Sequence, residues 1–483
     1  MIKKISLLLV ALLLLGTLTV GFVGCADTED GYDVETSNTV NTQETDDGYI
    51  ADDLPENNFE GQTVTILTTT FRDGYNYILQ TEYDGSVLNE TMVRAYINVS
   101  ERFNLKIARE CPGDQGTVMN QVNTTTLAGD TSFDIVYNCD THVAANAVNG
   151  CFLNINSMEL VNLDKPWWTR TSREFQFGGK LYFTASYFGL LSPYMNVGLY
   201  YNKQIAETNH IDIPYEDIEA GKWYIEDMIG MTKNMKQDLD GDGLIDEDDQ
   251  YGFVSSHAGN VSAQANLLGP FITLDQKGMP TMEIDTEKCH SYMQLMSRIY
   301  ENGTDEYGGA ADYNMDIFAA GRSLFAFTET RCIVEKRNEG MSVSFGMIPF
   351  PKYDENQEQY SSAGYDLFFA VNRNVADRSD IIATVLEGMS CQNYNNVLPV
   401  IWENILGVRL SENATDYAMV CIVRDATYVN PDYGYNTQIL GLRELVSLWD
   451  YTTLGEVSSH ISSTAPKSKV SLKLFAEKMV KLP

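Results

Sequence analysis

The sequence predicts an α/β protein whose sheets are largely parallel, and two observations support this class. Short runs rich in β-branched and aromatic residues alternate with longer runs that carry apolar residues at helical spacing. In addition, about 425 residues remain after the N-terminal segments described below, which is too long for one typical core. We therefore expect an α/β fold divided into two lobes.

The individual elements follow from local patterns. The expected strands are short and apolar, at residues 63–68, 133–137, 198–201, 250–254, 323–328 and 367–371. The expected helices have apolar residues every three or four positions, at residues 88–103 and 223–236. Ligands of such sheets bind beyond the carboxyl ends of the strands. The segments after three strands are therefore the candidate site segments: 69–75, 138–142 and 329–331.

The N-terminus is predicted to be a lipoprotein signal peptide, residues 1–24. Two lysines precede an uncharged apolar run from Ile5 to Gly24, and Cys25 follows. A basic start and a small residue before the cysteine are typical of an export signal. The stretch FVGC resembles a bacterial lipobox, which implies cleavage before Cys25 and lipidation of this cysteine. An uncleaved membrane anchor and plain secretion are the alternatives.

Residues 25–57 are predicted to be an acidic, disordered tether. No lysine or arginine occurs from Ala26 to Phe71, and the segment is rich in Thr, Asn, Asp and Glu. Such a composition buries too little apolar surface to fold alone. As a coil it would reach some tens of ångströms from the lipidated end.

The charge balance restricts the possible partners. The chain has 33 basic and 67 acidic residues, which gives a net charge of −34. This balance argues against binding nucleic acid or anionic lipid through a basic face. A strongly anionic ligand would need a local basic pocket, so a neutral ligand is favoured.

The cysteines do not indicate a metal centre. Eight are present, and seven remain besides Cys25, so at least one is unpaired within the chain. None forms a CxxC pair, which argues against a zinc ribbon. We expect most of them to be buried as small apolar residues.

The stretch DLDGDGLIDEDDQYGF, from Asp238 to Phe253, has the spacing of a calcium-binding loop. A sharp turn is needed at its sixth position, where Gly243 lies, and calcium takes six to eight oxygen ligands. The expected ligands occupy positions 1, 3, 5, 7, 9 and 12, the seventh through its carbonyl: Asp238, Asp240, Asp242, Leu244, Asp246 and Asp249.

One such loop does not make a sensor. Sensor EF-hands have a helix on both sides and usually a paired loop. Here a strand is expected after the loop, at 250–254, and the sequence has no second copy. We therefore expect structural Ca²⁺ in a clip that closes a turn over residues 238–249; the alternative is an acidic turn that binds no ion.

Several segments resemble, in order, extracellular solute-binding proteins of the sugar-type (family 1) ABC-importer family. The clearest are NVGLYYNKQIAETNHI, GKWYIEDMIGMTKNMK and the acidic loop itself. Further similarity lies in FDIVYNCDTHVAANAVNGCFLNI, FAAGRSLFAFTET, FGMIPFPK and SSAGYDLFFAVNRN. Each segment is weak evidence alone, but their order covers nearly the whole mature chain.

The resemblance implies a two-lobe, periplasmic-binding-protein-like type II fold with mixed, mainly parallel sheets and a hinge between the lobes. Lobe 1 is expected at 58–190 and 343–395, and lobe 2 at 191–342 and 396–483. The implied function is capture of a carbohydrate, in particular an oligosaccharide, in the interlobe cleft and its delivery to the transmembrane subunits of an ABC permease. The resemblance also implies a monomer that is held on the outer side of the cell membrane by its lipid.

Candidate ligand contacts follow from the same resemblance. Arg72, Asp73 and Tyr75 follow the first strand, and Asp140, Thr141 and His142 follow the second. Glu329 and Arg331 replace the Gly-Pro-Trp that the family often has at this point, so an aromatic platform is lost there. The remaining candidates are expected to supply cleft or second-lobe contacts: His257, Tyr365, Asp366, Trp402 and Tyr433. Trp167 and Trp168 are expected to pack within a lobe.

Other functions are less well supported. The chain has no GxSxG, HExxH or P-loop pattern, so we do not expect an enzyme. Paired carboxylates of a glycan-active enzyme cannot be recognised among 67 acidic residues. A calcium-dependent surface module resembling a dockerin would need two loops. A binder of peptides or of another non-sugar solute remains the main alternative.

Overall fold

The structure is a computed structural model that describes residues 48–74, 78–305 and 313–483. The predicted signal peptide (1–24), the predicted lipidation site Cys25, the tether as far as residue 47, and Tyr75 lie outside these residues. The described residues belong to one compact unit, Thr42–Pro483. None of the described helices has the length and apolarity needed to cross a membrane.

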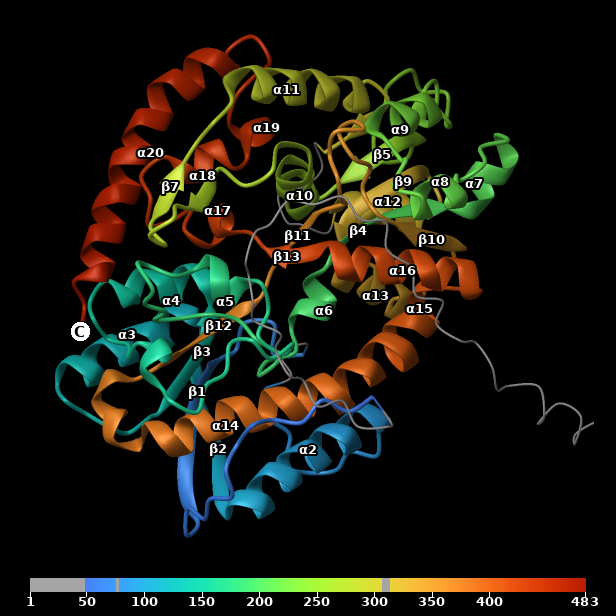
Figure 1. Cartoon of the computed structure of the whole chain (residues 1–483). Coiled ribbons are helices and arrows are strands. Elements are labelled where there is room, and N and C mark those ends of the chain that lie inside the picture. The colour runs from blue at the N-terminus through green and yellow to red at the C-terminus, as the bar shows by residue number, and fades with distance from the viewer. Residues whose placement is uncertain (1–47, 75–77, 306–312) are drawn as a thin grey trace, which may run out of the picture. The chain divides into compact units, whose positions relative to one another are not determined.

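The first sheet forms the core of lobe 1 (Figure 1). Its strands, in spatial order, are β12 (Leu367–Val371), β3 (Ile135–Cys139), β1 (Gln62–Thr69) and β2 (Leu105–Gly113). β1 pairs in parallel with β2 and β3, whereas β12 runs antiparallel to β3. Three of these strands confirm the runs expected from the sequence. The main helices of this lobe are α2 (Val87–Phe103), α3 (Gln115–Leu127), α4 (Asp140–Ala147) and α14 (Ser379–Gln392).

Helix α2 shows why the sequence pattern was informative. Its buried residues include Leu88, Met92, Val99 and Phe103, which recur at helical spacing. The Ser86 side chain accepts a hydrogen bond from the backbone N–H of Asn89 and begins the helix.

The second sheet forms the core of lobe 2. Its spatial order is β10 (Phe345–Ile348), β4 (Val197–Asn202), β9 (Ser323–Glu329), β5 (Tyr251–Ser255) and β8 (Gly303–Thr304). β5 is parallel to β8 and β9, and β4 is antiparallel to β9 and β10. The helices of this part are α7 (Lys203–Thr208), α8 (Tyr215–Glu219), α9 (Ile225–Thr232), α10 (His257–Leu268), α11 (Thr286–Tyr300), α12 (Tyr313–Ala319) and α13 (Thr330–Asn338).

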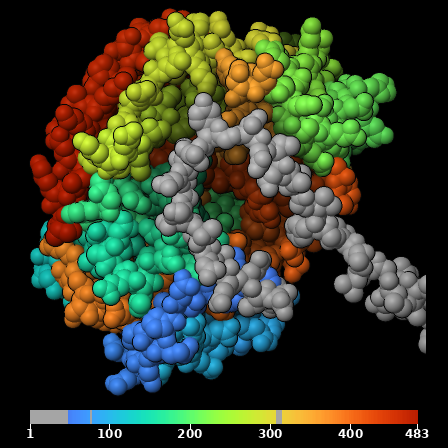
Figure 2. All heavy atoms as spheres, viewed as in Figure 1, coloured from blue at the N-terminus to red at the C-terminus, as the bar shows by residue number. Residues whose placement is uncertain are grey.

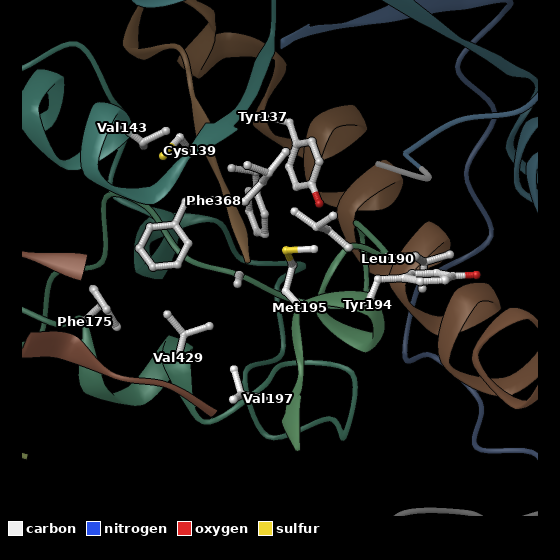
Figure 3. Packing of buried hydrophobic residues seen from close by; sticks show 14 of the residues in the cluster. Tyr137, Cys139, Val143, Phe175, Leu190, Tyr194, Met195, Val197, Phe368 and Val429 are labelled. Carbon is white, nitrogen blue, oxygen red and sulfur yellow. The ribbon is translucent and has the colours of Figure 1, made fainter. Parts of the chain in front are cut away.

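The chain connects the two sheets through three segments that lie close together. The first contains α6 (Ser192–Met195) and leads into β4. The other two contain β11 (Ser362–Gly364) and β13 (Thr427–Val429), which pair in parallel. Figure 3 shows Met195 of α6, Val197 of β4 and Val429 of β13 near Phe368 of β12. These residues belong to one continuous apolar cluster, so the core runs from one lobe into the other.

The expected lobe boundary at residue 343 is wrong. The FGMIPFPK segment was expected to return to lobe 1, but β10 pairs with β4 in the second sheet. The connection from α13 to β10 is short, and short connections join neighbouring elements of the same lobe. The return to lobe 1 comes later, through β11 and β12.

The C-terminal segment, 396–483, was expected to belong to lobe 2. The structure shows that it is not confined to this lobe. It contains α16 (Ala414–Ala426), α17 (Pro431–Gly434), α18 (Leu442–Leu445), α19 (Leu448–Tyr451) and α20 (Val457–Val480). α20 contacts α11 and β7 (Pro280–Met282), which pairs with β6 (Ile272–Leu274). The Phe475 ring of α20 also lies 5.6 Å from the Phe177 ring of the first lobe. The C-terminal segment therefore contacts both lobes, and an aromatic pair makes the contact with lobe 1.

The end of the predicted tether is ordered. Asn395 exchanges hydrogen bonds of 2.9 Å with the backbone N–H and carbonyl of Ile50, and Leu54 is buried. Asp52 and Asp53 pair with Arg102 and Lys165. For residues 48–57 the expectation of disorder is wrong, because specific partners outside the segment satisfy its backbone and charges.

The cysteines behave largely as expected. No disulfide joins the seven cysteines that the structure describes. Five of them are buried: Cys139, Cys151, Cys289, Cys332 and Cys391.

Glu387 of α14 fixes the two adjacent tryptophans that were expected to pack within a lobe. The indole N–H groups of Trp167 and Trp168 donate to its two carboxyl oxygens at 2.5 and 2.8 Å. Both rings are buried. Burial raises the pKa of Glu387 to about 7 in spite of these hydrogen bonds.

This pKa predicts a pH-dependent stability. A folded-state pKa of Glu387 raised from 4.5 to about 7 means that folding favours the protonated carboxyl. The contribution of this group to the free energy of unfolding is therefore full below pH 4.5 and is lost as the pH rises through 7. The Glu387→Gln side chain cannot ionise. The free energy of unfolding of this variant, relative to that of the wild type, should therefore rise by about 2 kcal/mol from pH 5 to pH 8. Thermal or urea unfolding at the two pH values measures the difference.

The exposed Glu101→Gln is the matched control and should follow the wild type at both pH values. An E387Q variant whose stability difference from the wild type is the same at pH 5 and pH 8 would contradict the assignment.

Candidate binding site between the two lobes

A cavity of about 660 Å³ lies where the connecting segments meet. It is lined by residues of α6, of the stretches beside β11 and β13, of the loop Pro166–Thr171, and of the helical stretch that continues α14. Figure 2 shows a hollow between the green-to-teal and the orange-to-red segments, which are the parts of the chain that contribute these residues. The volume is in the range of pockets that hold small organic ligands.

The wall formed after α14 has unusual helical geometry. Asn393–Val397 and Val400–Gly407 are π-helical, and this stretch places Tyr394, Trp402 and Glu403 along the cavity. π-helical segments are frequent at functional sites. Within this stretch, a Cβ atom on Gly407 would lie 2.7 Å from the carbonyl oxygen of Trp402, so the close turn requires glycine.

Aromatic rings line the cavity on more than one side. Tyr187 and Tyr394 have ring centroids 5.8 Å apart and are tilted by 34°. Trp402 lies on the same wall, and Tyr428 lies beside β11 with the Arg170 guanidinium 4.5 Å from its ring centroid. Flat apolar faces of this kind can stack on the apolar faces of a sugar ring.

Two buried polar side chains line the same cavity. Neither the amide nitrogen nor the amide oxygen of Asn196 has a hydrogen-bond partner in the structure, although the residue is 1 % exposed. Asp366 is also buried, and burial raises the pKa of its carboxyl well above the usual range. Unpaired buried polar groups cost free energy, so this arrangement favours a ligand or water that supplies the missing partners.

The two arginines that line the cavity each have a carboxylate partner. Arg424 donates to Asp425 at 2.7 Å, and Arg170 pairs with Glu174. Asp366 favours the neutral form because its pKa is raised. Among the residues that the structure describes, the cavity therefore offers no unpaired guanidinium for a strongly anionic ligand.

Three predicted contacts meet beside this cavity. The Tyr365 hydroxyl, which belongs to a cavity-lining residue, donates to Cys139 Sγ at 2.7 Å, and its ring lies 6.2 Å from the Tyr433 ring. Asp140 begins α4, is fully buried, and has one carboxyl oxygen without a partner. Burial raises the pKa of Asp140 well above its ordinary value. Of the thirteen predicted contacts, Tyr365, Asp366 and Trp402 line the cavity itself.

Four of the other predicted contacts form ion pairs with neighbouring charges: Asp73, His257, Glu329 and Arg331. Asp73 pairs with Arg109, and His257 Nδ1 lies 2.8 Å from Asp450. Arg331 lies 3.2 Å from Glu329 and also pairs with Glu335. These charges hold neighbouring elements together.

Three further predicted contacts lie close to the strand ends without lining the cavity. The Arg72 guanidinium lies 5.2 Å from the centroid of the Phe71 ring, and its Nε has no partner. The Thr141 carbonyl accepts a hydrogen bond from Gln438 at 2.7 Å, and the Thr141 hydroxyl lies 3.5 Å from His142 Nδ1.

Sequence reasoning missed most of the cavity wall. The missed residues include Arg170, Tyr187, Ser192, Asn196, Tyr394, Glu403, Arg424 and Tyr428. They come from loops, helices, a π-helical stretch and the short strand β13 rather than from the ends of the long strands. Nothing in the sequence around Ser192 and Asn196 indicated which face of this segment would meet a ligand.

The acidic loop is separate from the cavity. Asp238, Asp240 and Asp242 are exposed, and each places one oxygen so that all three lie within 4.8 Å of one another. Gly241 and Gly243 have φ angles of +79° and +87°. Glycine adopts such positive φ angles readily, so the backbone can turn sharply between the carboxylates. Hydrogen bonds between Gln237 and Gln250, of 3.0 and 3.1 Å, close the loop. None of the expected ligands of this loop lines the cavity described above.

The donor set fits a hard cation. Carboxylate oxygens are the ligands that calcium prefers. Asp249 faces inward, is 1 % exposed, and accepts hydrogen bonds from the backbone N–H groups of Leu239 and Asp246. The Leu244 side chain is 64 % exposed, which is compatible with the expected use of its carbonyl only.

Comparison with known proteins identifies the fold. No protein-family model matches the sequence, and no curated protein matches it. Among solved structures, UspC from M. tuberculosis is 13 % identical, covers 85 % of this chain and 100 % of its own, and has a TM-score of 0.55. A sugar transporter from Rhizobium etli in an open conformation is 13 % identical, with coverage of 87 % and 100 % and a TM-score of 0.53.

A third structure is explicitly of the expected family. A family 1 extracellular solute-binding protein from Bifidobacterium longum subsp. infantis is 14 % identical, with coverage of 84 % of this chain and 99 % of that chain and a TM-score of 0.52. The chain therefore has the two-lobe α/β fold of periplasmic-binding-protein type. The resemblance to family 1 solute-binding proteins is confirmed at the level of this fold.

Asn196 provides a test of the site. Replacing an unpaired buried amide by an apolar side chain of similar size removes a desolvation cost. Asn196→Leu should therefore stabilise the ligand-free protein by about 1 kcal/mol or more in thermal or urea unfolding.

Asn202→Leu is the matched control. The Asn202 side chain begins α7 by accepting hydrogen bonds from the backbone N–H groups of Gln204 and Ile205. This substitution should destabilise the protein by about 1 kcal/mol. Equal destabilisation by both substitutions would show that Asn196 is satisfied without a ligand.

Proposed function

We propose that this protein is the lipid-anchored substrate-binding protein of an ABC importer, and that it captures a neutral carbohydrate, in particular an oligosaccharide. The observation that carries the proposal is the cavity between the lobes, which combines aromatic walls with the buried, unpaired amide of Asn196 and the buried carboxyl of Asp366. A sugar presents hydroxyl groups and apolar ring faces, and both find counterparts there. The fold shared with sugar-transporter and family 1 structures supports the same conclusion.

The ligand would be held from several elements at once. Trp402, Tyr187 and Tyr394 would stack on ring faces, whereas Asn196 and Asp366 would exchange hydrogen bonds with hydroxyl groups. Burial raises the pKa of the Asp366 carboxyl, which favours the protonated form that can donate as well as accept. The paired charges favour a neutral solute over a charged one.

The remaining parts of the proposal concern delivery. Lipidation of Cys25 and the acidic segment after it would keep the protein beside a permease on the outer side of the membrane. Ligand binding between the lobes would favour a closed arrangement, which the transmembrane subunits would recognise. The protein would act as a monomeric binder and would carry out no chemical step.

Trp402→Ala tests the ligand site. In the wild type, thermal-shift screening with neutral linear oligosaccharides should show a stabilisation that grows with ligand concentration. Trp402→Ala should weaken the Kd of the best ligand, measured by calorimetry, by about tenfold or more, because a stacking face is removed.

Trp449→Phe is the matched control, because Trp449 stacks on Tyr300 away from the cavity and should leave the Kd unchanged. Stabilisation by peptides with none by oligosaccharides would contradict the carbohydrate assignment. A glycan that is cleaved would contradict the binding role.

For the acidic loop we propose a structural Ca²⁺ ion held by Asp238, Asp240, Asp242, the Leu244 carbonyl, Asp246 and Asp249. The ion would neutralise carboxylates that crowd a turn between α9 and β5. Its role would be to fix this turn, because the loop contributes nothing to the cavity wall.

Chelation tests this clip. Removing calcium should lower the stability of the wild type by about 2–3 kcal/mol if the ion was present at a hundredfold excess over its Kd. The Asp240→Asn/Asp242→Asn double variant should no longer respond to chelator, whereas Asp248→Asn in the same loop should respond as the wild type does. Oligosaccharide affinity should persist without calcium; its complete loss in a folded protein would contradict a structural role.

A further inference from the structure

The outer side of α20 carries a cluster of lysines in an otherwise acidic protein. Between residues 467 and 481 the sequence has five lysines and a single acidic residue, Glu477. All five lysines are exposed: Lys467, Lys469, Lys473, Lys478 and Lys481. Elsewhere acidic residues exceed basic ones, because the chain has 67 of the former and 33 of the latter. This local reversal of charge is not explained by the ligand site.

Two large apolar side chains are exposed among these lysines. Val470 and Leu474 are each 61 % exposed. With Lys467, Lys478 and Lys481 they recur every three or four residues and therefore lie on one helical face, which we call the outer stripe. The opposite face of the helix buries Leu472, Phe475 and Met479 against the protein.

The surface beside the outer stripe also combines apolar and lysine side chains. A groove of about 360 Å³ runs beside the helix, where Met279 and Met282 of the β7 region meet Leu472. Lys469 and Lys473 line the same groove. Figure 1 shows α20 along the edge of the unit, and its residues form a red surface in Figure 2.

The lysines are little neutralised by neighbours. Among the described residues, the ion pair recorded for this cluster joins Lys473 Nζ to Glu477, and its two atoms are 4.0 Å apart. At physiological salt, charges further away than about 8 Å are largely screened. Lys469 also shares a hollow with Glu283 and Asp285. The positive patch that an approaching surface meets is therefore that of the outer stripe, with Lys467, Lys478 and Lys481.

We propose that the outer stripe of α20 docks on a membrane surface that contains anionic lipids. The lysines would bind phosphate groups of the lipid heads, and Val470 and Leu474 would enter the boundary between heads and acyl chains. A helix with apolar residues on one face and lysines around them is the pattern of interfacial binding. The two exposed apolar residues on the face itself favour a membrane over an acidic protein loop, because the lysines alone would be enough to bind such a loop.

Membrane docking goes beyond the proposed function and rests on one part of it, the location of the protein at the membrane. The net charge argued against a basic lipid-binding face, but the distribution of lysines provides one locally. The affinity would be low, because each lysine near an anionic surface contributes about fivefold in binding. The proposed lipid on Cys25 would tether the protein and so raise the local concentration of α20 at the membrane. This concentration would be enough for such weak docking to orient the protein.

Vesicle binding tests the docking directly. The chain from Ala26 onward, which contains the whole compact unit but no lipidated cysteine, is mixed with vesicles of phosphatidylglycerol and phosphatidylcholine or of phosphatidylcholine alone. We expect co-sedimentation with the anionic vesicles only, and a loss of binding as salt is raised. The Lys467→Glu/Lys473→Glu/Lys478→Glu variant should lose about a hundredfold in vesicle affinity.

The control variant changes the net charge by the same amount, but at three lysines outside α20. Lys106, Lys222 and Lys233 are also exposed, and their replacement by Glu should leave vesicle binding unchanged. Val470→Ser/Leu474→Ser should weaken binding without altering the unfolding midpoint. Equal loss in both triple variants, or equal binding to neutral vesicles, would overturn the proposal.

A dimer that these substitutions abolish would overturn it as well, because the stripe would then meet a second copy of the chain. Oligosaccharide binding is measured in parallel, so that failure of docking is distinguished from failure of the proposed function.

Discussion

The parallel pairing of β11 with β13 is the contact on which the arrangement of the site depends. Ser362, Ala363 and Gly364 lie opposite Thr427, Tyr428 and Val429, so two of the three connections between the lobes are joined side by side. A Cβ atom on Gly364 would lie 2.5 Å from the Thr427 side chain, so glycine permits this approach. The pairing places Tyr365 and Asp366 on one strand exit and Tyr428 on the neighbouring strand. The cavity therefore exists because the connections are held together.

The same region concentrates features that reduce the stability of the ligand-free protein. Asn196 has an unpaired amide, Asp140 has an unpaired carboxyl oxygen, and Asp366 is buried with a raised pKa. A sequence selected for stability alone would replace such groups by apolar ones. Their presence between the lobes, beside aromatic rings, is what a hydroxyl-rich ligand would require. Glu387, in contrast, has the indole partners that keep it a structural group.

The sequence predicted the sheets better than the site. The mainly apolar runs of β9 and β12 are buried on both faces, and this is a local property that the residues themselves encode. The acidic loop was also recognisable, because its ligand spacing is local. The cavity wall depends on which loops meet after folding, so Tyr187, Asn196 and Tyr428 could not be selected from their own surroundings. The π-helical stretch around Trp402 and the assignment of β10 to lobe 2 likewise depend on tertiary contacts.

Hydrogen exchange in the presence of a bound oligosaccharide tests the central claim most directly, because it reports where the ligand is held. The account predicts that saturating ligand slows exchange in four segments that border the cavity: 192–196, 364–366, 394–403 and 427–429. Exchange in the acidic loop, residues 238–249, should change little. Slower exchange confined to that loop or to the outer surface of either lobe, with none in the four segments, would contradict the account.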